Sequence, residues 1–329
     1  RIRMISIRKK ALSLKEFYSP GKPAVACTGN QCKLISEFND KIRKDLVKFE
    51  SVPCLCGSNT FDMIAEVDRY GILQDTVICV ECGLVQSNPR MTKEELTAFY
   101  SSDLYRLCYD GENYLEKYEN KYTPEYGRHI FYEIDKVKRI DPGISILEIG
   151  AGGGLNLLPF IDKGAKVLGI DYSPSLIELG LKHAIPMKQG SIDTIPGQYD
   201  VIVINHVLEH FLNPVDSLRK IALHSKPEGI IYISVPNILN FNMGQLQNAH
   251  TYYFSPYTLE RYCAEAGLGL LAIGKAQNIH LFGIFRLGDA QDRPAFRCKK
   301  TKINFNLVKL KTLVKRILRP QKKCANLKR

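Results

Sequence analysis

The hydrophobic pattern of the chain changes character near residue 144. From there on, short and nearly continuous apolar runs alternate with longer segments in which apolar residues recur every three or four positions. Short continuous runs are typical of strands buried on both faces of a parallel sheet, and the longer periodic segments are typical of amphipathic helices. The pattern predicts strands near 144–149, 166–170, 186–189, 199–204, 230–235, 268–275 and 280–287. It predicts helices over 154–163, 174–183, 212–224 and 256–266, of which the last three have a proline in their first turn.

The first 138 residues follow a different pattern. Apolar residues at helical spacing within 31–50 predict an amphipathic helix: Leu34, Phe38, Ile42, Leu46 and Phe49. Residues 61–78 look like a short β-hairpin, and residues 92–138 are helical in pattern and rich in tyrosine. We therefore divide the chain into five segments: a helical lead (1–50), a cysteine-bearing module (51–91), a helical connector (92–138), an α/β domain (139–290) and a basic tail (291–329).

A glycine-rich turn follows the first strand of the α/β domain. Gly150, Gly152 and Gly154 come directly after that strand, which suits a tight turn where the backbone must approach a ligand closely. Asp171 ends the second strand, where it can accept hydrogen bonds from ribose hydroxyls. Glu148 precedes the turn, and its carboxylate would repel a pyrophosphate but suits the ammonium group of S-adenosylmethionine. The pattern therefore favours S-adenosylmethionine over a dinucleotide.

Further candidate residues lie at the carboxyl ends of later strands. Asn205 follows the fourth strand, where open α/β sheets bind their ligands. Over residues 125–290 the chain resembles the class I S-adenosylmethionine-dependent methyltransferases, which implies a Rossmann-like sheet of seven strands ending in an antiparallel pair. The resemblance also implies that Glu148 and the three glycines hold the methionine part of the cofactor and that Asp171 holds its ribose. The adenine contact would fall to residues of the next loop: Ser191, Ile192 or Asp193.

Four of the ten cysteines form two pairs with metal-ligand spacing. The pairs are Cys54-Leu-Cys56 and Cys79-Val-Glu-Cys82, each followed by a glycine. Four thiolates on two tight turns can close a tetrahedral Zn²⁺ site, and a closed site of this kind is structural rather than catalytic. The alternative is a set of reduced core cysteines, and Cys27 and Cys32 are weaker candidates as ligands. The segment therefore predicts a small zinc-ribbon-like module.

No apolar run in the sequence reaches 18 residues, and the apolar stretch after Met4 is broken by Arg8, Lys9 and Lys10. We therefore expect neither a membrane span nor a secretory signal. The expected location is cytoplasmic, where clustered thiols favour a metal over a disulfide.

The cysteine module adds a second resemblance. Cys56-Gly-Ser58, Cys79 to Gln86 and Phe99 to Arg106 are similar to the zinc-binding segment and tyrosine-rich helix of bacterial methyltransferases of deoxysugar and surface-polysaccharide pathways. In the sugar C-methyltransferases of that group a further large domain follows the catalytic one, and this sequence shows none. The resemblance implies O-methylation of a sugar of a surface polysaccharide or of its nucleotide-linked or lipid-linked precursor. The alternative is a secondary-metabolite deoxysugar pathway, C-methylation included.

Two histidines are candidates for the base that removes the acceptor proton. A sugar hydroxyl is weakly acidic, and histidine is the usual proton acceptor near neutral pH. His206 follows the fourth strand, next to the expected methyl group, and His250 precedes the helix that begins near Pro256. A histidine in the corresponding loop is the base in the sugar C-methyltransferases, so His250 is the first choice and His206 the second. The alternative is that each caps a helix or binds a backbone carbonyl.

The helical connector carries candidate contacts to the acceptor. Tyr105, Arg106 and Tyr109 lie on adjacent turns of one predicted helix face. Tyrosine offers a sugar a flat apolar surface and a hydroxyl, and arginine binds phosphate, so this face would suit a lid over an anionic sugar nucleotide. The alternative for each residue is ordinary packing.

The net charge of +12 is unevenly distributed. Residues 293–329 hold 14 Lys and Arg and no acid, and residues 1–50 carry a net charge of +7. When the charges of these two segments are subtracted from the total, residues 51–292 carry a net charge of −9. Because an acidic core repels phosphates, this distribution disfavours nucleic acid as a partner, and an RNA methyltransferase would depend on the two ends of the chain alone.

The basic tail is predicted to bind anionic membrane surfaces. Its apolar residues recur at spacings of four and three and would form one helical stripe among basic residues: Ile303, Leu307, Leu310, Val314 and Ile317. Such a helix adds apolar burial to about 1 kcal/mol for each nearby basic residue, which would hold the chain at the inner face of the cytoplasmic membrane. The alternative is a frayed, solvated terminal helix or one packed on its own domain.

Vesicle sedimentation tests the tail. The full chain should pellet with anionic but not with neutral liposomes and should be released by high salt. A chain that ends near Asp292 should stay in the supernatant and keep its cofactor affinity. Equal sedimentation of the two chains would show that the tail is no membrane anchor.

Overall fold

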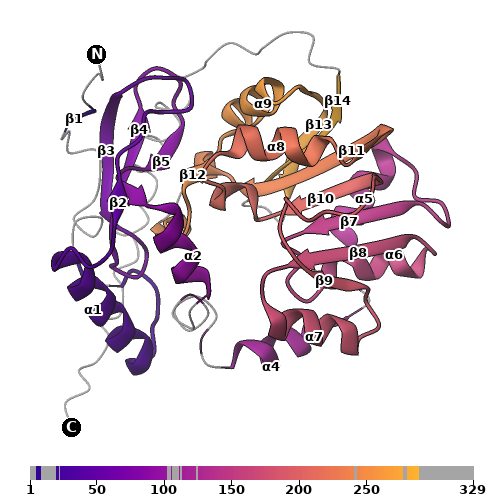
Figure 1. Ribbon diagram of the computed structural model, residues 1–329, viewed down its shortest axis with the longest axis horizontal. Helices are drawn as coiled ribbons and strands as arrows, with labels where there is room; N and C mark the ends of the chain where they lie inside the picture. Colours follow the sequence, from indigo (N-terminus) through magenta and orange to yellow (C-terminus); the bar gives the residue numbers. More distant parts are fainter. Residues whose placement is uncertain are drawn as a thin grey trace, which may run out of the picture.

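The computed structural model describes residues 5–8, 20–21, 23–101, 105, 111, 113–123, 125–240, 243–276 and 280–288. Within these ranges the chain forms a five-stranded, a seven-stranded and a two-stranded sheet. Figure 1 shows the five-stranded sheet and α1 on one side of the molecule and the seven-stranded sheet with its helices on the other. The predicted tail (291–329), Arg106 and Tyr109 lie outside the described residues.

The seven-stranded sheet has the order β13-β14-β11-β10-β7-β8-β9. Its parallel strands are β7 (Ser145–Ile149), β8 (Lys166–Asp171), β9 (Met187–Gln189), β10 (Tyr199–Asn205) and β11 (Ser225–Pro236). β14 (His280–Leu287) runs antiparallel to both β11 and β13 (Leu268–Ala276). This arrangement confirms the predicted Rossmann-like methyltransferase sheet with its final antiparallel pair. β11 begins earlier than predicted, because Ser225 pairs with Tyr199 ahead of a register shift.

Helices cover both faces of this sheet. α8 (Pro214–Ala222) and α9 (Pro256–Glu265) share one core with Leu147 and Ile149 of β7. The other core contains Ile146 of β7 together with residues of the remaining helices: α5 (Arg128–Val137), η2 (Leu155–Leu157), α6 (Leu158–Asp162) and α7 (Pro174–Lys182). Successive β7 residues point to opposite faces, as expected in a strand. The predicted helices are confirmed, and Pro174, Pro214 and Pro256 begin three of them.

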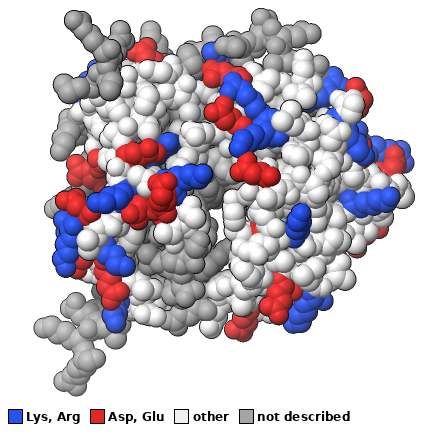
Figure 2. Space-filling model, viewed as in Figure 1, with Lys and Arg blue, Asp and Glu red and all other residues white. Residues whose placement is uncertain are grey.

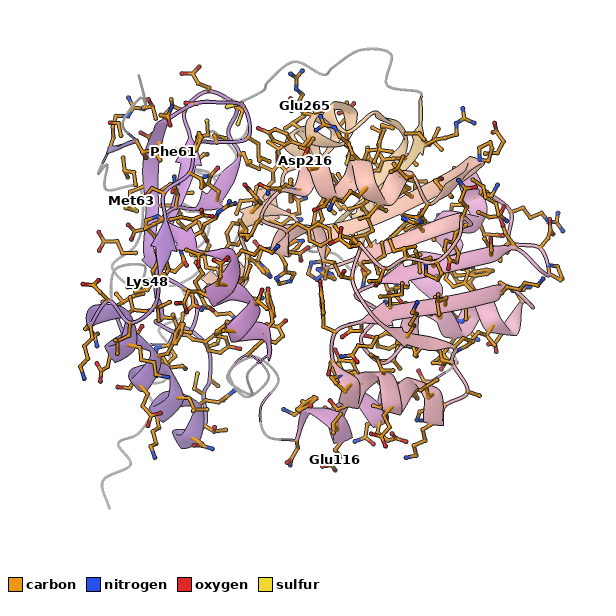
Figure 3. All side chains as sticks on the ribbon, viewed as in Figure 1. Lys48, Phe61, Met63, Glu116, Asp216 and Glu265 are labelled. Carbon is orange, nitrogen blue, oxygen red and sulfur yellow. The ribbon has the colours of Figure 1, made fainter. Side chains whose placement is uncertain are left out.

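A guanidinium clamps α8 to α9. Arg219 donates one hydrogen bond to the Asp216 carboxylate (2.6 Å) and another to the Glu265 carbonyl oxygen (2.9 Å). Figure 3 labels Asp216 and Glu265 at the same end of the α/β domain. The clamp fixes the C-terminal end of α9, whose N-terminus follows the segment that carries His250.

The five-stranded sheet joins the two halves of the chain. Its order is β1-β3-β4-β5-β12. β1 (Ser6–Arg8), β3 (Thr60–Val67), β4 (Leu73–Cys79) and β5 (Val85–Ser87) come from the N-terminal part, whereas β12 (Tyr252–Tyr253) comes from the α/β part. Phe61 and Met63 of β3, both labelled in Figure 3, lie in the same core as Leu147 of β7. The cysteine-bearing module therefore packs as part of one molecule with the α/β domain.

The predicted N-terminal helix is shorter than its apolar pattern. α1 spans Gly29–Arg43 and begins with a capping box between Thr28 and Gln31. Asp45 adopts a φ of +53°, a left-handed conformation that cannot continue an α-helix. Phe49 then belongs to β2 (Phe49–Glu50), which pairs with β6 (Arg90–Met91). The prediction of a helix over residues 44–50 was wrong. Leu46 and Phe49 continue the helical spacing of apolar residues, but the turn at Asp45 ends the helix before them.

Where it is described, the connector is largely helical, as its pattern predicts. Its described helices are α2 (Lys93–Ser101), α4 (Tyr114–Glu119) and α5. Figure 1 shows α4 beside α7, below the carboxyl ends of the parallel strands. No helix among the described residues is long and apolar enough to cross a bilayer.

Candidate active site

The glycine-rich turn folds back onto the neighbouring strand. The backbone N–H groups of Gly150 and Ala151 both donate to the Ile170 carbonyl oxygen of β8 (2.8 and 3.0 Å). Gly150 has a φ of +66°, and a Cβ atom there would lie 2.4 Å from Cγ2 of Val207. Both facts require glycine. They also place the segment after β10 directly against the turn after β7.

Asp171 locks the turn from the tip of β8. One carboxylate oxygen accepts the Gly152 N–H (2.7 Å) and the other accepts the Ser173 N–H (2.8 Å). Gly152 has a φ of +56°, and the nearest atoms to a Cβ there belong to Tyr118 at 3.5 Å. The structure therefore brings Asp171 and the glycine turn together, as the sequence predicted.

Glu148 is a buried carboxyl group with an unused oxygen. It is 1% exposed, and one oxygen accepts a hydrogen bond from Asn156 Nδ2 (2.6 Å). The other oxygen is buried and has no hydrogen-bond partner. Burial raises the pKa of Glu148 to about 8, against the lowering effect of Asn156. A cationic group placed here would compensate the carboxylate, which fits the ammonium end of S-adenosylmethionine.

Tyrosines of the connector cover the turn. Tyr122 donates a hydrogen bond to the Gly153 carbonyl oxygen (2.6 Å) and stacks on His183 of the α7 C-terminus, with ring centroids 3.7 Å apart. His183 in turn lies 3.0 Å from Glu119. With Tyr118 next to Gly152, these rings form one wall of the cradle. The sequence analysis missed this role of Tyr118 and Tyr122, because a tyrosine-rich helical pattern does not show which ring faces the turn.

The predicted adenine loop lies at the carboxyl end of β9. The Ser191 N–H donates to Thr194 Oγ1 (2.9 Å), and the Asp193 carboxylate lies 2.6 Å from Nζ of Lys220. Ile192 packs partly against the core. These contacts order the loop near Asp171, since the Gly190 N–H donates to the Asp171 carbonyl oxygen (3.0 Å).

His206 lies at the carboxyl end of β10, directly after Asn205. Its φ is +56°, an unusual value for a non-glycine residue, and its N–H donates to the Ser234 carbonyl oxygen (2.9 Å). Its side chain is 34% exposed, and Nδ1 lies 3.3 Å from Oε1 of Glu209. The ring meets His280 edge to face at 4.3 Å. Burial, with a further effect of His206, lowers the pKa of His280 to about 4.

His250 is buried in a loop built by both halves of the chain. It is 3% exposed, and its Nδ1 has no hydrogen-bond partner. Its carbonyl oxygen accepts a hydrogen bond from Ser87 Oγ (2.8 Å), and the Asn248 N–H donates to the Asp68 carboxylate (3.1 Å). Burial, followed by the effect of His210, lowers the pKa of His250 well below its ordinary value.

Glu209 and His210 lie between the two candidate histidines. Glu209 is 1% exposed; although burial acts to raise the pKa of its carboxyl group, the hydrogen bond with His206 and the nearby His210 hold that pKa at about 2. The His210 ring meets the His250 ring edge to face at 4.8 Å. A buried carboxylate therefore lies among imidazoles at the carboxyl end of β10.

Tyr105 is linked to His210 through the ring of Tyr100. Its ring contacts Tyr100 at 4.8 Å, and the Tyr100 hydroxyl lies 2.6 Å from His210 Nδ1. The connector therefore reaches the histidine edge of the site through Tyr100, a residue that the sequence analysis did not single out.

The four predicted metal ligands converge. Sγ of Cys54 lies 3.4 Å from Sγ of Cys82, and Sγ of Cys56 lies 3.6 Å from Sγ of Cys79. All four sulfur atoms lie within 4.8 Å of one another. A tetrahedral zinc site with Zn–S bonds of about 2.3 Å separates its sulfurs by about 3.8 Å, so the spacing fits one ion. The Tyr262 hydroxyl of α9 donates to Cys82 Sγ (3.2 Å) and links this cluster to the α/β domain.

Comparison with known proteins identifies the large domain. Residues 122–273 match a family model described as a methyltransferase domain. The chain is 30% identical over 156 residues to the ubiquinone biosynthesis O-methyltransferase of Azoarcus sp. (strain BH72), which covers 40% of this chain and 66% of that protein. It is 33% identical over 113 residues to the mitochondrial ubiquinone biosynthesis O-methyltransferase of Schizosaccharomyces pombe, which covers 31% of this chain and 41% of that protein. The chain spans between 41% and 76% of the length of such curated relatives.

Solved structures give similar but distant matches. One is the 1,6-didemethyltoxoflavin-N1-methyltransferase of Burkholderia thailandensis, with a TM-score of 0.48, 16% identity and coverage of 64% of this chain and 98% of that chain. Another is the magnesium protoporphyrin IX methyltransferase of Synechocystis PCC 6803, with a TM-score of 0.45, 15% identity and coverage of 59% of this chain and 100% of that chain. The family match begins at Tyr122, so the cysteine cluster lies outside it.

Replacing Glu148 should stabilise the ligand-free chain and weaken cofactor binding. Between its ordinary pKa of 4.5 and its folded value of about 8, the folded chain holds the Glu148 proton more tightly than the unfolded chain. This carboxyl group therefore lowers stability progressively as the pH rises through that range. Glu148→Gln should raise the free energy of unfolding by about 1 to 3 kcal/mol at pH 8 and by much less at pH 5.

Denaturant unfolding at the two pH values and calorimetry with S-adenosylmethionine measure both effects. Asp200→Asn is a control, because it replaces another carboxyl group of the same sheet, at the start of β10 and away from the glycine turn. A Glu148→Gln chain that is less stable than the parent at pH 8, or that binds the cofactor equally well, would contradict the assignment.

Proposed function

We propose that this chain, whose residues 122–273 form a methyltransferase domain, transfers the methyl group of S-adenosylmethionine to a hydroxyl oxygen of a sugar. The acceptor would belong to a surface polysaccharide or to its nucleotide-linked or lipid-linked precursor. The cofactor would lie against the glycine turn, with its ammonium group at Glu148 and its ribose at Asp171. Asn205 and the loop of Ser191, Ile192 and Asp193 would complete its contacts.

The contact between Val207 and the glycine turn is the observation that carries this proposal. The turn leaves no room for a Cβ at Gly150 because Val207 fills that space. The residue before Val207 is His206, which is partly exposed and held by Glu209. A histidine that can accept a proton therefore lies beside the cradle for the methyl donor, which is the arrangement that O-methyl transfer requires.

For methyl transfer the protein has mainly to align the acceptor hydroxyl with the methyl group and to remove the hydroxyl proton. The sulfonium group is a good leaving group, so the methyl group passes to the acceptor oxygen in line with the breaking C–S bond. His206 would take the hydroxyl proton on its other ring nitrogen, Nε2, while Glu209 orients the ring through Nδ1. Of the two histidines chosen from the sequence, His206 has the exposure that a base needs, since its side chain is 34% exposed whereas His250 is 3% exposed.

The curated relatives suggest a second class of acceptor. The curated relatives are O-methyltransferases of ubiquinone biosynthesis, which favours oxygen as the acceptor atom but suggests a hydroxylated quinone precursor rather than a sugar. The matched part of the chain is the methyltransferase domain, whereas the loop of His250 is built on Asp68 and Ser87 of the N-terminal part. We favour a sugar because that N-terminal part, whose motifs resemble those of sugar-modifying methyltransferases, supports the acceptor side.

RNA is the least favoured acceptor. On the face shown in Figure 2, acidic and basic side chains of the described residues are interspersed rather than gathered by sign. A phosphate backbone is bound through extended basic surfaces, and the acidic balance of residues 51–292 opposes this.

We also assign one structural Zn²⁺ to Cys54, Cys56, Cys79 and Cys82. Sulfur spacing supports this assignment, and so does the tight turn at each pair, in which the Gly57 N–H donates to the Cys54 carbonyl and the Gly83 N–H donates to the Cys79 carbonyl. The set offers four thiolates and is closed to substrate, so the ion would support the fold and take no part in methyl transfer.

Methyl transfer to parallel acceptor panels tests the function. Labelled S-adenosylmethionine is incubated with nucleotide sugars, lipid-linked oligosaccharides, hydroxylated quinone precursors and structured RNA. Label should enter a sugar acceptor, and His206→Ala should reduce kcat by about 10² to 10⁴ with cofactor affinity unchanged.

His224→Ala is the matched control, since His224 lies at the opposite end of the sheet, where its ring contacts the Gly197 carbonyl oxygen. Label that enters only the quinone precursors or only RNA would refute the sugar acceptor, and full activity of His206→Ala would refute the base.

Elemental analysis tests the zinc assignment. The purified chain should hold about one zinc ion, and Cys79→Ser should lose most of it together with thermal stability. Cys263→Ser is the control, because Cys263 is a buried cysteine of α9 that is not part of the cluster. A metal-free but fully stable chain would exclude the zinc site.

A further inference from the structure

A second group of metal-ligand type lies beside the proposed acceptor site. Glu209, His210 and His250 each offer one ligand atom, and these atoms lie within 4.8 Å of one another. Glu209 and His210 follow β10, whereas His250 comes from the loop before β12. Two imidazoles and one carboxylate converging from separate segments are a common ligand set for divalent transition metals.

Two atoms of this group lack any hydrogen-bond partner. One is Oε2 of Glu209, and the other is Nδ1 of His250; both are buried. The two residues are 1% and 3% exposed. A buried carboxylate oxygen or ring nitrogen without a partner costs free energy, which a bound cation would offset. Because Oε2 of Glu209 and Nδ1 of His250 belong to one cluster, a single bound ligand could satisfy both atoms.

His210 is oriented as metal-binding histidines are. Its Nδ1 lies 3.1 Å from the Ala249 carbonyl oxygen and 2.6 Å from the Tyr100 hydroxyl. These partners occupy Nδ1 and leave Nε2 for another contact. A histidine that binds a metal usually donates its other ring N–H to a backbone carbonyl, which fixes the tautomer and the direction of the ring.

The backbone around the three ligands is also fixed. The Thr251 N–H donates to the Glu209 carbonyl oxygen (2.8 Å), and the Ser87 hydroxyl donates to the His250 carbonyl oxygen (2.8 Å). The Asp68 carboxylate accepts a hydrogen bond from the N–H of Asn248, two residues before His250. The ligands are therefore held before any ion arrives, which reduces the entropy lost on binding.

Hydrogen bonds within the protein do not satisfy the whole group. Oε1 of Glu209 lies 3.3 Å from His206 Nδ1, which leaves Oε2 without a partner. One divalent ion bound to Oε2 of Glu209 and to Nδ1 of His250 would satisfy both buried atoms at once.

We propose that Glu209, His210 and His250 bind one divalent transition-metal ion, distinct from the ion of the cysteine cluster. The mixed nitrogen and oxygen ligands suit Mn²⁺, Fe²⁺, Co²⁺ or Zn²⁺. His206, which contacts Glu209, is adjacent to this ion. If the proposed O-methyl transfer is correct, Glu209, His210 and His250 would hold this ion beside His206, the proposed base, and the ion would supply Lewis-acid chemistry there.

Binding of Mn²⁺ and Co²⁺ to the zinc-loaded full chain tests the site without reference to activity. Mn²⁺ prefers oxygen and nitrogen ligands, so the cysteine cluster should not take it up. Electron paramagnetic resonance of free Mn²⁺ should show one binding site per chain. Bound Co²⁺ should give d–d absorption without the thiolate charge-transfer bands of a cysteine site.

Substitutions locate the ion. Glu209→Gln and His250→Gln should each weaken Mn²⁺ binding at least about tenfold, whereas His224→Gln should leave it unchanged. Circular dichroism and calorimetry with S-adenosylmethionine establish that each chain is folded. His280→Gln serves as a second control, because His280 packs on His206 but is not one of the three ligands.

The outcomes separate the ion from the reaction. Absence of a site for either ion in the folded parent chain, or equal affinity in all variants, would overturn the metal site even if methyl transfer to a sugar is found. Mn²⁺ binding that depends on Glu209 and His250 would support the metal site even if the acceptor is not a sugar.

Discussion

The pairing of β12 with β5 fixes the loop of His250, on the side of the molecule where we propose that the acceptor binds. Tyr252 and Tyr253 pair with Gln86 and Val85, residues that follow the second cysteine pair closely in sequence. Through this pairing a strand of the α/β domain becomes the last strand of the N-terminal sheet. The loop that carries His250 comes immediately before β12, so its position is set by both halves of the chain.

Two buried carboxylates define the functional edge that this arrangement creates. Glu148 at the end of β7 and Glu209 after β10 each have an oxygen with no hydrogen-bond partner. The strands β7 and β10 are neighbours, and parallel strands bring their carboxyl ends to one edge. In each residue the oxygen without a partner, Oε2, is buried, and a bound cation would offset the cost of its burial. On this account the edge has one place for the ammonium group of the methyl donor and one for a metal ion near the acceptor.

Sequence patterns were sufficient for features whose determinants are local. Apolar runs located the strands of the large sheet, and the spacing of Gly150, Gly152 and Gly154 located the cofactor turn. The four clustered cysteines did converge. Two features could not be found in this way. β12 is only Tyr252–Tyr253, too short to show a pattern, and the partners of the Glu209 cluster lie about 40 residues apart in sequence.

The cysteine-bearing module holds the loop of His250 against the methyltransferase domain. Hydrogen exchange of backbone amides in residues 246–254, compared between the parent chain and Cys79→Ser, measures this dependence. We expect these amides to lose protection in Cys79→Ser together with those of β5, while β7 and β8 at the glycine turn stay protected. Equal protection of residues 246–254 in the two chains would show that the loop does not depend on the module.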